Sequence, residues 1–203
     1  MTYKTKCATV EEELEWDNFI PSKATRLIIG TFPTAPHRRS FQFFYPNKDN
    51  PFWEVLASIA EIELVNVDDP NAIQNRQSIL TKLKLGITDM GKKVLRHANS
   101  SLDQSILPVE FMDIFQILDD NPTIQKLILT SSSGENSVDG WLSSYCKLNS
   151  VKYKKLKGTN PKRGILKHND KEIQVVSVHS TSRAATKKLD VLVAMYREEL
   201  NRF

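Results

Sequence analysis

The segment IIGTFPTAPHRRSFQFFYPNKDNPFWEVL, residues 28–56, decides how the chain is predicted to fold. An apolar run ends at Gly30, and a segment crowded with aromatic, proline and basic residues follows it. The chain then becomes helical from Pro51, because proline suits the first turn of a helix and apolar residues recur after it at helical spacing. We therefore expect a buried strand, a long loop and a helix, in that order.

Strand-like and helix-like segments alternate along the rest of the chain. Short apolar runs predict strands at residues 26–29, 85–90, 124–130 and 173–178. Helical spacing predicts helices at residues 51–63, 71–83, 108–118, 135–148 and 182–201, and a hairpin-like turn falls at 168–170. This alternation predicts an α/β fold, a three-layer α/β/α sandwich around a mostly parallel central sheet of about four strands. Without a repeat or linker, residues 1–203 are expected to form a single domain.

The composition is that of an ordinary soluble protein, with 26% charged and 40% hydrophobic residues among 203. No run approaches the roughly 18 apolar residues of a membrane span, and the N-terminus has no apolar core of signal-peptide length. Cys7 and Cys146 stand at no metal or redox spacing, so we expect reduced thiols. These features predict a cytoplasmic monomer that contacts no membrane and holds no metal or other cofactor.

Basic residues are concentrated in one part of the chain. The net charge is +4, but residues 147–188 carry twelve Lys and Arg against only Asp170 and Glu172. A polyanion favours such a segment, because each neutralised phosphate releases counterions. A lysine-rich face that is simply solvated would give the same pattern, so charge alone does not decide between them.

The predicted sheet brings three polar segments to one edge. In an open α/β sheet the ligand crevice lies outside the carboxyl ends of the strands. That rule places together the residues that follow Gly30, those that follow Asp89 and those that follow Val178. The aromatic and basic loop is therefore expected where a ligand would bind.

Together, these three segments resemble the uracil-DNA glycosylase superfamily over roughly residues 25–195. GTFPTAP…FFYPNKDNPFWEVL is similar to the first motif of the hypoxanthine-DNA glycosylase-like branch, where a Gly-x-Phe-Pro turn leads through paired aromatics to Pro-x-Asn-x-Phe-Trp. GITDMGK (86–92) is similar to the Gly-Ile-Thr-Asp-Leu stretch of mismatch-specific uracil-DNA glycosylases. VHSTSRAA (178–185) resembles the Pro-Ser-Thr-Ser-Pro-Ala loop of the hypoxanthine branch.

The resemblance implies a monofunctional DNA glycosylase that acts in base-excision repair. Its partner would be DNA that contains a deaminated base, uracil or hypoxanthine, which the enzyme flips out and removes by hydrolysis of the N-glycosidic bond. Such a reaction passes through an oxocarbenium-like sugar and needs a positioned water and charge stabilisation. A flipped base also needs a stacking surface and hydrogen bonds to its edge.

Two residues are the catalytic candidates. By the resemblance, Asn50 orients the attacking water, although asparagine before Pro51 is equally what a helix N-cap requires. His179 would stabilise the departing base anion, since its pKa suits chemistry near neutrality. In one alignment His179 replaces the proline before Ser-Thr-Ser. In the other it takes the place of the histidine in the His-Pro-Ser-Pro loop of the uracil-removing branch.

Four residues are the candidates for binding the base. Phe32, Phe44 and Tyr45 would stack on it, at about 1–3 kcal/mol per base, or would pack the loop onto the sheet instead. Asp89 falls where the family contacts the base edge, but aspartate at a strand end is often only a turn former.

Basic and hydroxyl side chains are expected to contact the DNA backbone: Arg38, Arg39, Lys154, Lys155, Lys157, Ser180, Thr181, Ser182 and Arg183. Two departures from the family raise an alternative. Thr31 and Phe32 stand where other branches carry Asp or Asn after the first-motif glycine, and Arg183 replaces a proline. A catalytically silent nucleic-acid-binding module of the same fold therefore stays open. A hydrolase of free nucleosides is a more remote alternative, because a small substrate needs no long basic track.

Overall fold

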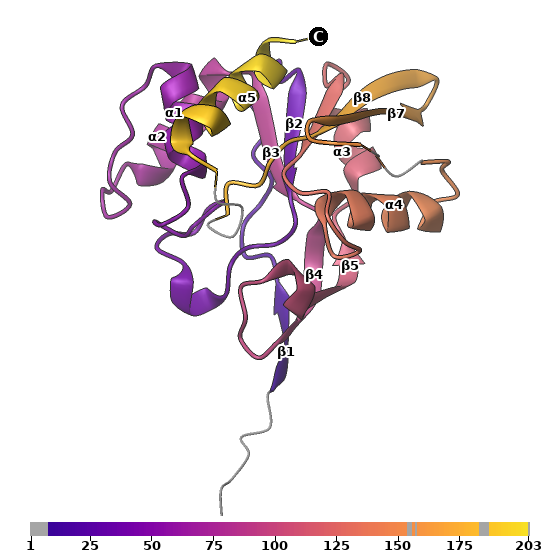
Figure 1. The fold of residues 1–203 in the computed structure, drawn as a ribbon, viewed down its shortest axis with the longest axis horizontal. Helices are drawn as coiled ribbons and strands as arrows, with labels where there is room; N and C mark the ends of the chain where they lie inside the picture. Colours follow the sequence, from indigo (N-terminus) through magenta and orange to yellow (C-terminus); the bar gives the residue numbers. More distant parts are fainter. Residues whose placement is uncertain (1–7, 154–155, 157, 183–186, 203) are drawn as a thin grey trace, which may run out of the picture.

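The protein folds around a central sheet of five strands (Figure 1). The structure is a computed structural model, and it describes residues 8–153, 156, 158–182 and 187–202. In their order across the sheet, the strands are β3 (Leu85–Asp89), β2 (Arg26–Gly30), β6 (Lys126–Leu129), β8 (Lys171–Ser177) and β7 (Lys162–His168). Neighbouring strands are parallel from β3 to β8, and β7 is antiparallel to β8. The α/β class is confirmed, and the sheet is mixed.

The sequence predicted a central sheet of about four strands, and β7 is the fifth strand that it did not predict. It lies at the sheet edge and only Leu166 within it is fully buried, so no apolar run marks it. The predicted hairpin-like turn is confirmed. Asn169 and Asp170 have φ values of 45° and 60°, the left-handed conformation that two-residue hairpin turns require and that Asn and Asp tolerate.

Helices pack on both faces of the sheet, as Figure 1 shows. They are α1 (Phe52–Ala60), α2 (Ala72–Lys82), α3 (Ile114–Asp120), α4 (Val138–Leu148) and α5 (Leu189–Asn201). Because side chains alternate along a strand, Ile28 of β2 joins a core with α1, α2 and α5. Leu27 and Ile29 join the opposite core with α3 and α4. Among the described residues, no helix has the length and apolar character to cross a bilayer.

The helix predicted at residues 108–118 is wrong in its first half. Residues Ile106–Phe111 form a strand, β5, and the helix α3 follows it. Asp113 caps the N-terminus of α3, because its side chain accepts a hydrogen bond from Gln116 N–H at 3.0 Å. Pro108 was interpreted as the first residue of a helix. It lies instead in an edge strand, where a missing N–H costs no sheet hydrogen bond. The last helix begins at Leu189, later than the predicted 182.

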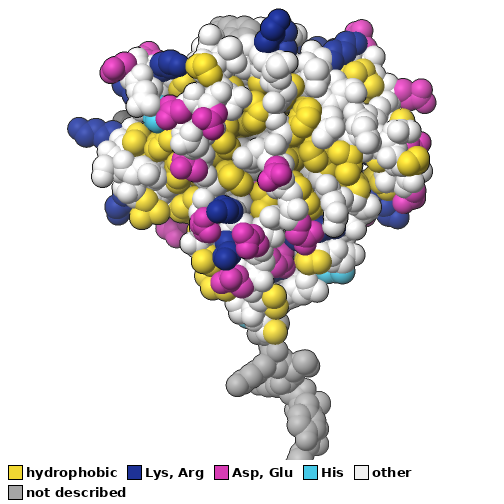
Figure 2. Space-filling model, turned by 180° about the vertical axis from the view of Figure 1, so that it is seen from behind, with side chains coloured by type: hydrophobic (Ala, Val, Ile, Leu, Met, Phe, Trp, Pro, Cys, Tyr) yellow, Lys and Arg dark blue, Asp and Glu magenta, His cyan; other side chains and the backbone are white. Residues whose placement is uncertain are grey.

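A second, antiparallel sheet of three strands lies beyond the carboxyl edge of the central sheet and was not predicted. Its order is β1 (Thr9–Glu13), β4 (Gly91–His97) and β5. Only Met90 separates β3 from β4, and Met90 N–H donates to Gly30 O at 2.8 Å. Lys and Glu side chains pair across its strands, as Lys92 does with Glu110. Figure 2 shows basic and acidic side chains together over the lower part of the molecule.

Candidate functional site

A cavity of about 540 Å³ opens where the parallel strands of the central sheet end. Gly30 ends β2, Asp89 ends β3, Thr130 follows β6 and Ser180 lies after β8, and all four line the cavity. The three segments that the sequence placed at one edge therefore do meet there. We call the lining from these strand ends the floor of the cavity.

Asp89 is a buried acidic residue of the floor. The residue is only 5% exposed, and the structure gives its carboxylate no hydrogen bond from any described residue. Gly30 pairs with Asp89 across β2 and β3, and a Cβ at position 30 would lie 2.2 Å from Asp89 Oδ1. Glycine is therefore required for the carboxylate to occupy this place. Burial, and to a lesser extent the charge of Asp103, raise the pKa of Asp89 to about 7.

Asp103 is a second carboxylate at the cavity, and sequence reasoning missed it. It opens the short 3-10 helix η2 (Asp103–Ser105) between β4 and β5, and Thr31 Oγ1 donates a hydrogen bond to its Oδ2 at 3.2 Å. The residue stays open to water at the cavity mouth, but the surrounding walls reduce its hydration and raise the pKa of its carboxyl to about 6. No local pattern in the sequence marks Asp103, because the fold of a distant sheet brings it here.

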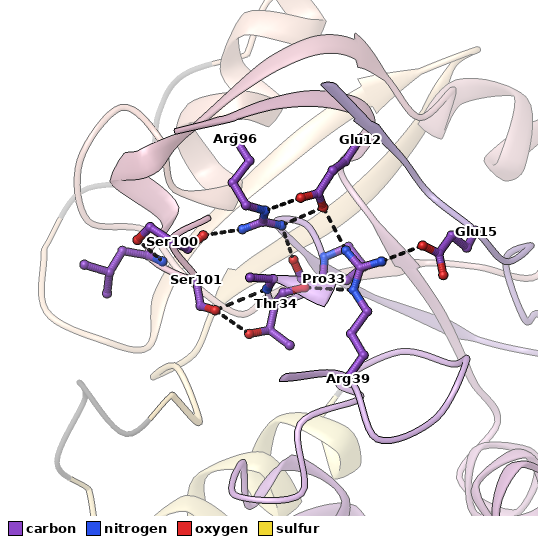
Figure 3. A network of polar contacts seen from close by, with 10 residues as sticks. Glu12, Glu15, Pro33, Thr34, Arg39, Arg96, Ser100 and Ser101 are labelled. Carbon is purple, nitrogen blue, oxygen red and sulfur yellow. Dashed lines mark hydrogen bonds and ion pairs between the residues drawn. The ribbon is translucent and has the colours of Figure 1, made fainter. Parts of the chain in front are cut away.

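The remaining wall of the cavity is built by the loop at residues 31–50 and by residues 98–105, which connect β4 to β5 and include η2. Figure 3 shows the polar contacts that hold these two segments together. Arg96 of β4 donates to Glu12 of β1 at 2.7 Å and to the carbonyl of Pro33 at 2.7 Å. The hydroxyl of Thr34 donates to Ser101 Oγ at 2.7 Å. The second sheet thus fixes the first part of the loop, and we call these two segments the wall.

Arg39, which was expected at the DNA backbone, belongs to the same network. Its guanidinium donates to Glu12 at 2.8 Å, to Glu15 at 2.8 Å and to the carbonyl of Thr34 at 2.8 Å. The side chain is only 9% exposed. Arg39 therefore stabilises the wall and is not free to bind phosphate. Arg38, by contrast, is exposed and lines the cavity.

The three predicted stacking residues separate in the structure. Tyr45 lines the cavity, stacks on Phe52 with ring centroids 3.6 Å apart, and donates its hydroxyl to Thr130 Oγ1 at 2.9 Å. Phe32 also lines the cavity, at 9% exposure. Phe44 is fully buried in the core beside α1 and does not line the cavity, so it packs the loop and cannot stack on a ligand.

Asn50 lies one residue before Pro51, which occupies the N-cap position of α1. Oδ1 of Asn50 accepts a hydrogen bond from Phe52 N–H at 3.1 Å, which satisfies a donor in the first turn of α1. The same residue lines the cavity. The bond to Phe52 leaves the amide nitrogen of Asn50 unused, so support of the helix start and contact with a ligand are compatible at this position.

The segment after β8 contributes alternate residues to the cavity. Ser180 and Ser182 line it, whereas Thr181 is 2% exposed and its hydroxyl faces the protein interior. This burial argues against the expected contact of Thr181 with phosphate. His179 does not line the cavity; its Nδ1 lies 3.2 Å from Asn160 Nδ2, and burial, with the charge of Lys187, lowers the pKa of its imidazole.

Several predicted residues lie outside the part of the chain that the structure describes: Cys7, Lys154, Lys155, Lys157 and Arg183. Their expected roles stay predictions. Cys146 is a free, buried thiol, and burial raises its pKa to about 12.

Comparison of the sequence with protein-family models and with curated proteins finds no match. Among solved structures, the chain is similar to the solution NMR structure of a "putative Uracil DNA glycosylase" from Methanosarcina acetivorans. The TM-score is 0.57 and the sequences are 18% identical, over 92% of this chain and 97% of the other. At this identity the similarity shows a shared fold, and it extends over nearly the whole of both chains.

Proposed function

We propose that this protein is a DNA glycosylase that flips a deaminated base out of DNA and hydrolyses its N-glycosidic bond. The observation that carries the proposal is the cavity at the carboxyl edge of the sheet, in which buried Asp89, with no hydrogen bond to its carboxyl group from a described residue, shares the lining with Tyr45 and Asn50. Its volume of about 540 Å³ is within the range of about 300–1,000 Å³ that ligand sites have.

The chemistry of the lining fits a flipped base. A base removed from the stack loses its neighbours and its pairing partner, so an enzyme must offer an aromatic surface and polar groups at the base edge. Tyr45 and Phe32 offer the rings, and Asp89 offers the polar group at the floor. Uracil and hypoxanthine both present an N–H beside a carbonyl, which a single carboxyl group can meet as acceptor or donor.

The mouth of the cavity fits a nucleic-acid backbone. Arg38 and Ser182 are exposed there, and with Ser180 of the floor they offer a cation and two hydroxyl groups, which are the groups that contact phosphates in protein–DNA complexes. The lysine-rich segment that precedes β7 would extend this track along the DNA. The shared fold with the Methanosarcina protein is consistent with the proposal but does not identify the base.

A panel of labelled oligonucleotides that carry uracil, hypoxanthine or xanthine tests the proposal. After incubation with the protein, alkali cleaves the strand wherever a base has been removed. We expect cleavage at uracil or hypoxanthine, none in the undamaged control strand, and a loss of cleavage in Asp89→Ala without weaker binding to undamaged duplex. Abasic sites in none of the damaged strands would overturn the proposal.

A silent nucleic-acid-binding module is the second candidate, and one observation favours it. Thr31 stands in the cavity where other branches carry an Asp or Asn, so the first motif lacks a group that could act on water. This candidate predicts salt-dependent binding of DNA and no base release from any oligonucleotide of the panel.

A further inference from the structure

We propose that Asp103 is the general base of the reaction, taking a proton from the water that attacks the sugar, while Asp89 holds the flipped base. The inference rests on the proposed function. Asp89 and Asp103 reach one cavity from different sheets, Asp89 from the end of β3 and Asp103 from the connection between β4 and β5. One carboxyl group is therefore at the floor and the other at the mouth.

The hydrogen bonds of the two groups fit these roles. Asp103 accepts a bond from Thr31 Oγ1 on Oδ2, which fixes the carboxylate and leaves Oδ1 for a water molecule. The residue is open to solvent, so it can return the proton that it takes. Asp89 is mostly buried but lines the cavity, and its carboxyl group has no hydrogen bond from a described residue, so it is available to a ligand in the cavity.

The surroundings of the two carboxyl groups raise their pKa values to different extents. The other charged or titratable side chains near the pair come from β4 and from the loop after β2: Arg96, Arg39, Arg38 and Tyr45. Arg96 lowers the pKa of Asp103, and Arg39 lowers that of Asp89, but both arginines are also paired with Glu12. The resulting pKa values of about 6 for Asp103 and about 7 for Asp89 leave Asp103 ionised first as pH rises. Carboxyl groups so separated can act as base and as neutral donor.

The reaction balances with these two groups and water. The water oxygen forms a bond to C1′ of the sugar as the bond from C1′ to the base nitrogen breaks. Asp103 takes one proton of the water, and the electron pair of the broken bond stays on the base. The hydrogen bond from protonated Asp89 stabilises the charge that develops there, and the base then takes up a proton from solvent. Asp103 releases its proton to solvent, which restores the starting state.

Single-turnover cleavage of the best oligonucleotide, measured from pH 5 to pH 9, tests the proposal. For the wild type we expect a rate that rises through about pH 6 and falls above about pH 7. Asp103→Asn should lower the rate by about 10²-fold or more and remove the rising limb, since general bases contribute about 10²–10⁴-fold. Asp68→Asn, the same change at an exposed site away from the cavity, should leave the rate and the profile unchanged.

Two further variants separate catalysis from folding. Thr31→Val removes the bond that lowers the pKa of Asp103, so it should move the rising limb to higher pH while the protein still cleaves. Asp89→Asn keeps a donor at the floor at every pH and should lose the falling limb. If the wild type cleaves and Asp103→Asn retains its rate and rising limb, the role of Asp103 is overturned and the proposed function stands. If the wild type releases no base at all, both are overturned.

Discussion

The floor and the wall of the cavity are held in place by different forces. The floor follows strands whose residues are buried on both faces, so the position of Asp89 is fixed by the packing of apolar side chains above and below the sheet. The wall packs Phe43 and Phe44 into the core beside α1, and its position beside the second sheet depends in addition on Arg96, Arg39 and Glu12 (Figure 3). The floor therefore resists substitution by its packing, whereas the wall depends in addition on a few charged contacts.

The largest effect is expected from breaking the wall at Glu12. Glu12→Leu leaves Arg96, whose side chain is 1% exposed, without a carboxylate, and removing one partner of a buried pair costs about 3–5 kcal/mol. Unfolding in urea should show this loss of stability. Glu11→Leu on the same strand is the control, because Glu11 is exposed, pairs only loosely with Lys93, and should cost about 1 kcal/mol or less. Equal costs for the two variants would contradict a wall held by buried charge.

The next effect concerns Asn50, where the loop ends and α1 begins. Asn50→Ala should lower single-turnover cleavage by about 10²-fold or more if the amide positions water, and should also cost about 1 kcal/mol of stability through the lost cap. Asn50→Asp should keep the stability and some cleavage, because aspartate caps a helix equally well. A variant Asn50→Ala that is less stable yet cleaves at the wild-type rate would limit Asn50 to capping.

Gly30→Ala tests the floor. The added Cβ would lie 2.2 Å from Asp89 Oδ1, so the carboxylate must move, and a displacement of about 1 Å can cost on the order of 10²-fold in rate. The double variant Gly30→Ala/Asp89→Ala reveals the route of the effect. Adding Gly30→Ala to Asp89→Ala should cost little further rate if the glycine acts through Asp89. Independent, additive losses would show that Gly30 matters for another reason.

The smallest effect compares two neighbours within the wall. Arg38→Ala should leave stability unchanged and reduce the salt dependence of DNA binding by about one unit of slope, as expected for one lost phosphate contact. Arg39→Ala should lower the stability and leave the salt dependence of DNA binding unchanged, because the guanidinium of Arg39 is already paired with Glu12 and Glu15. Binding titrations at several salt concentrations, with thermal unfolding alongside, distinguish the two patterns. A slope that falls only for Arg39→Ala would contradict this assignment.

The sequence predicted the floor better than the wall, for a physical reason. Buried strands such as β2 and β6 appear in the sequence as short apolar runs. Because ligands bind at the carboxyl ends of parallel strands, Gly30 and Asp89 are then predicted at one edge of the sheet. Asp103 reaches the cavity only through the pairing of β1, β4 and β5, and those strands are too polar or too exposed to be read from periodicity. Similarly, Arg38 and Arg39 look alike in sequence and differ only in the carboxylates that surround them.

The single residue Met90 between β3 and β4 has a consequence for how this protein can diverge. An insertion or deletion there would shift the second sheet, and Asp103 with it, relative to Asp89, so natural variants should keep this joint at constant length. The connection at residues 98–105 also joins two strands of the second sheet, and it carries Asp103 and the Ser101 contact to Thr34, so its length is constrained by the cavity as well.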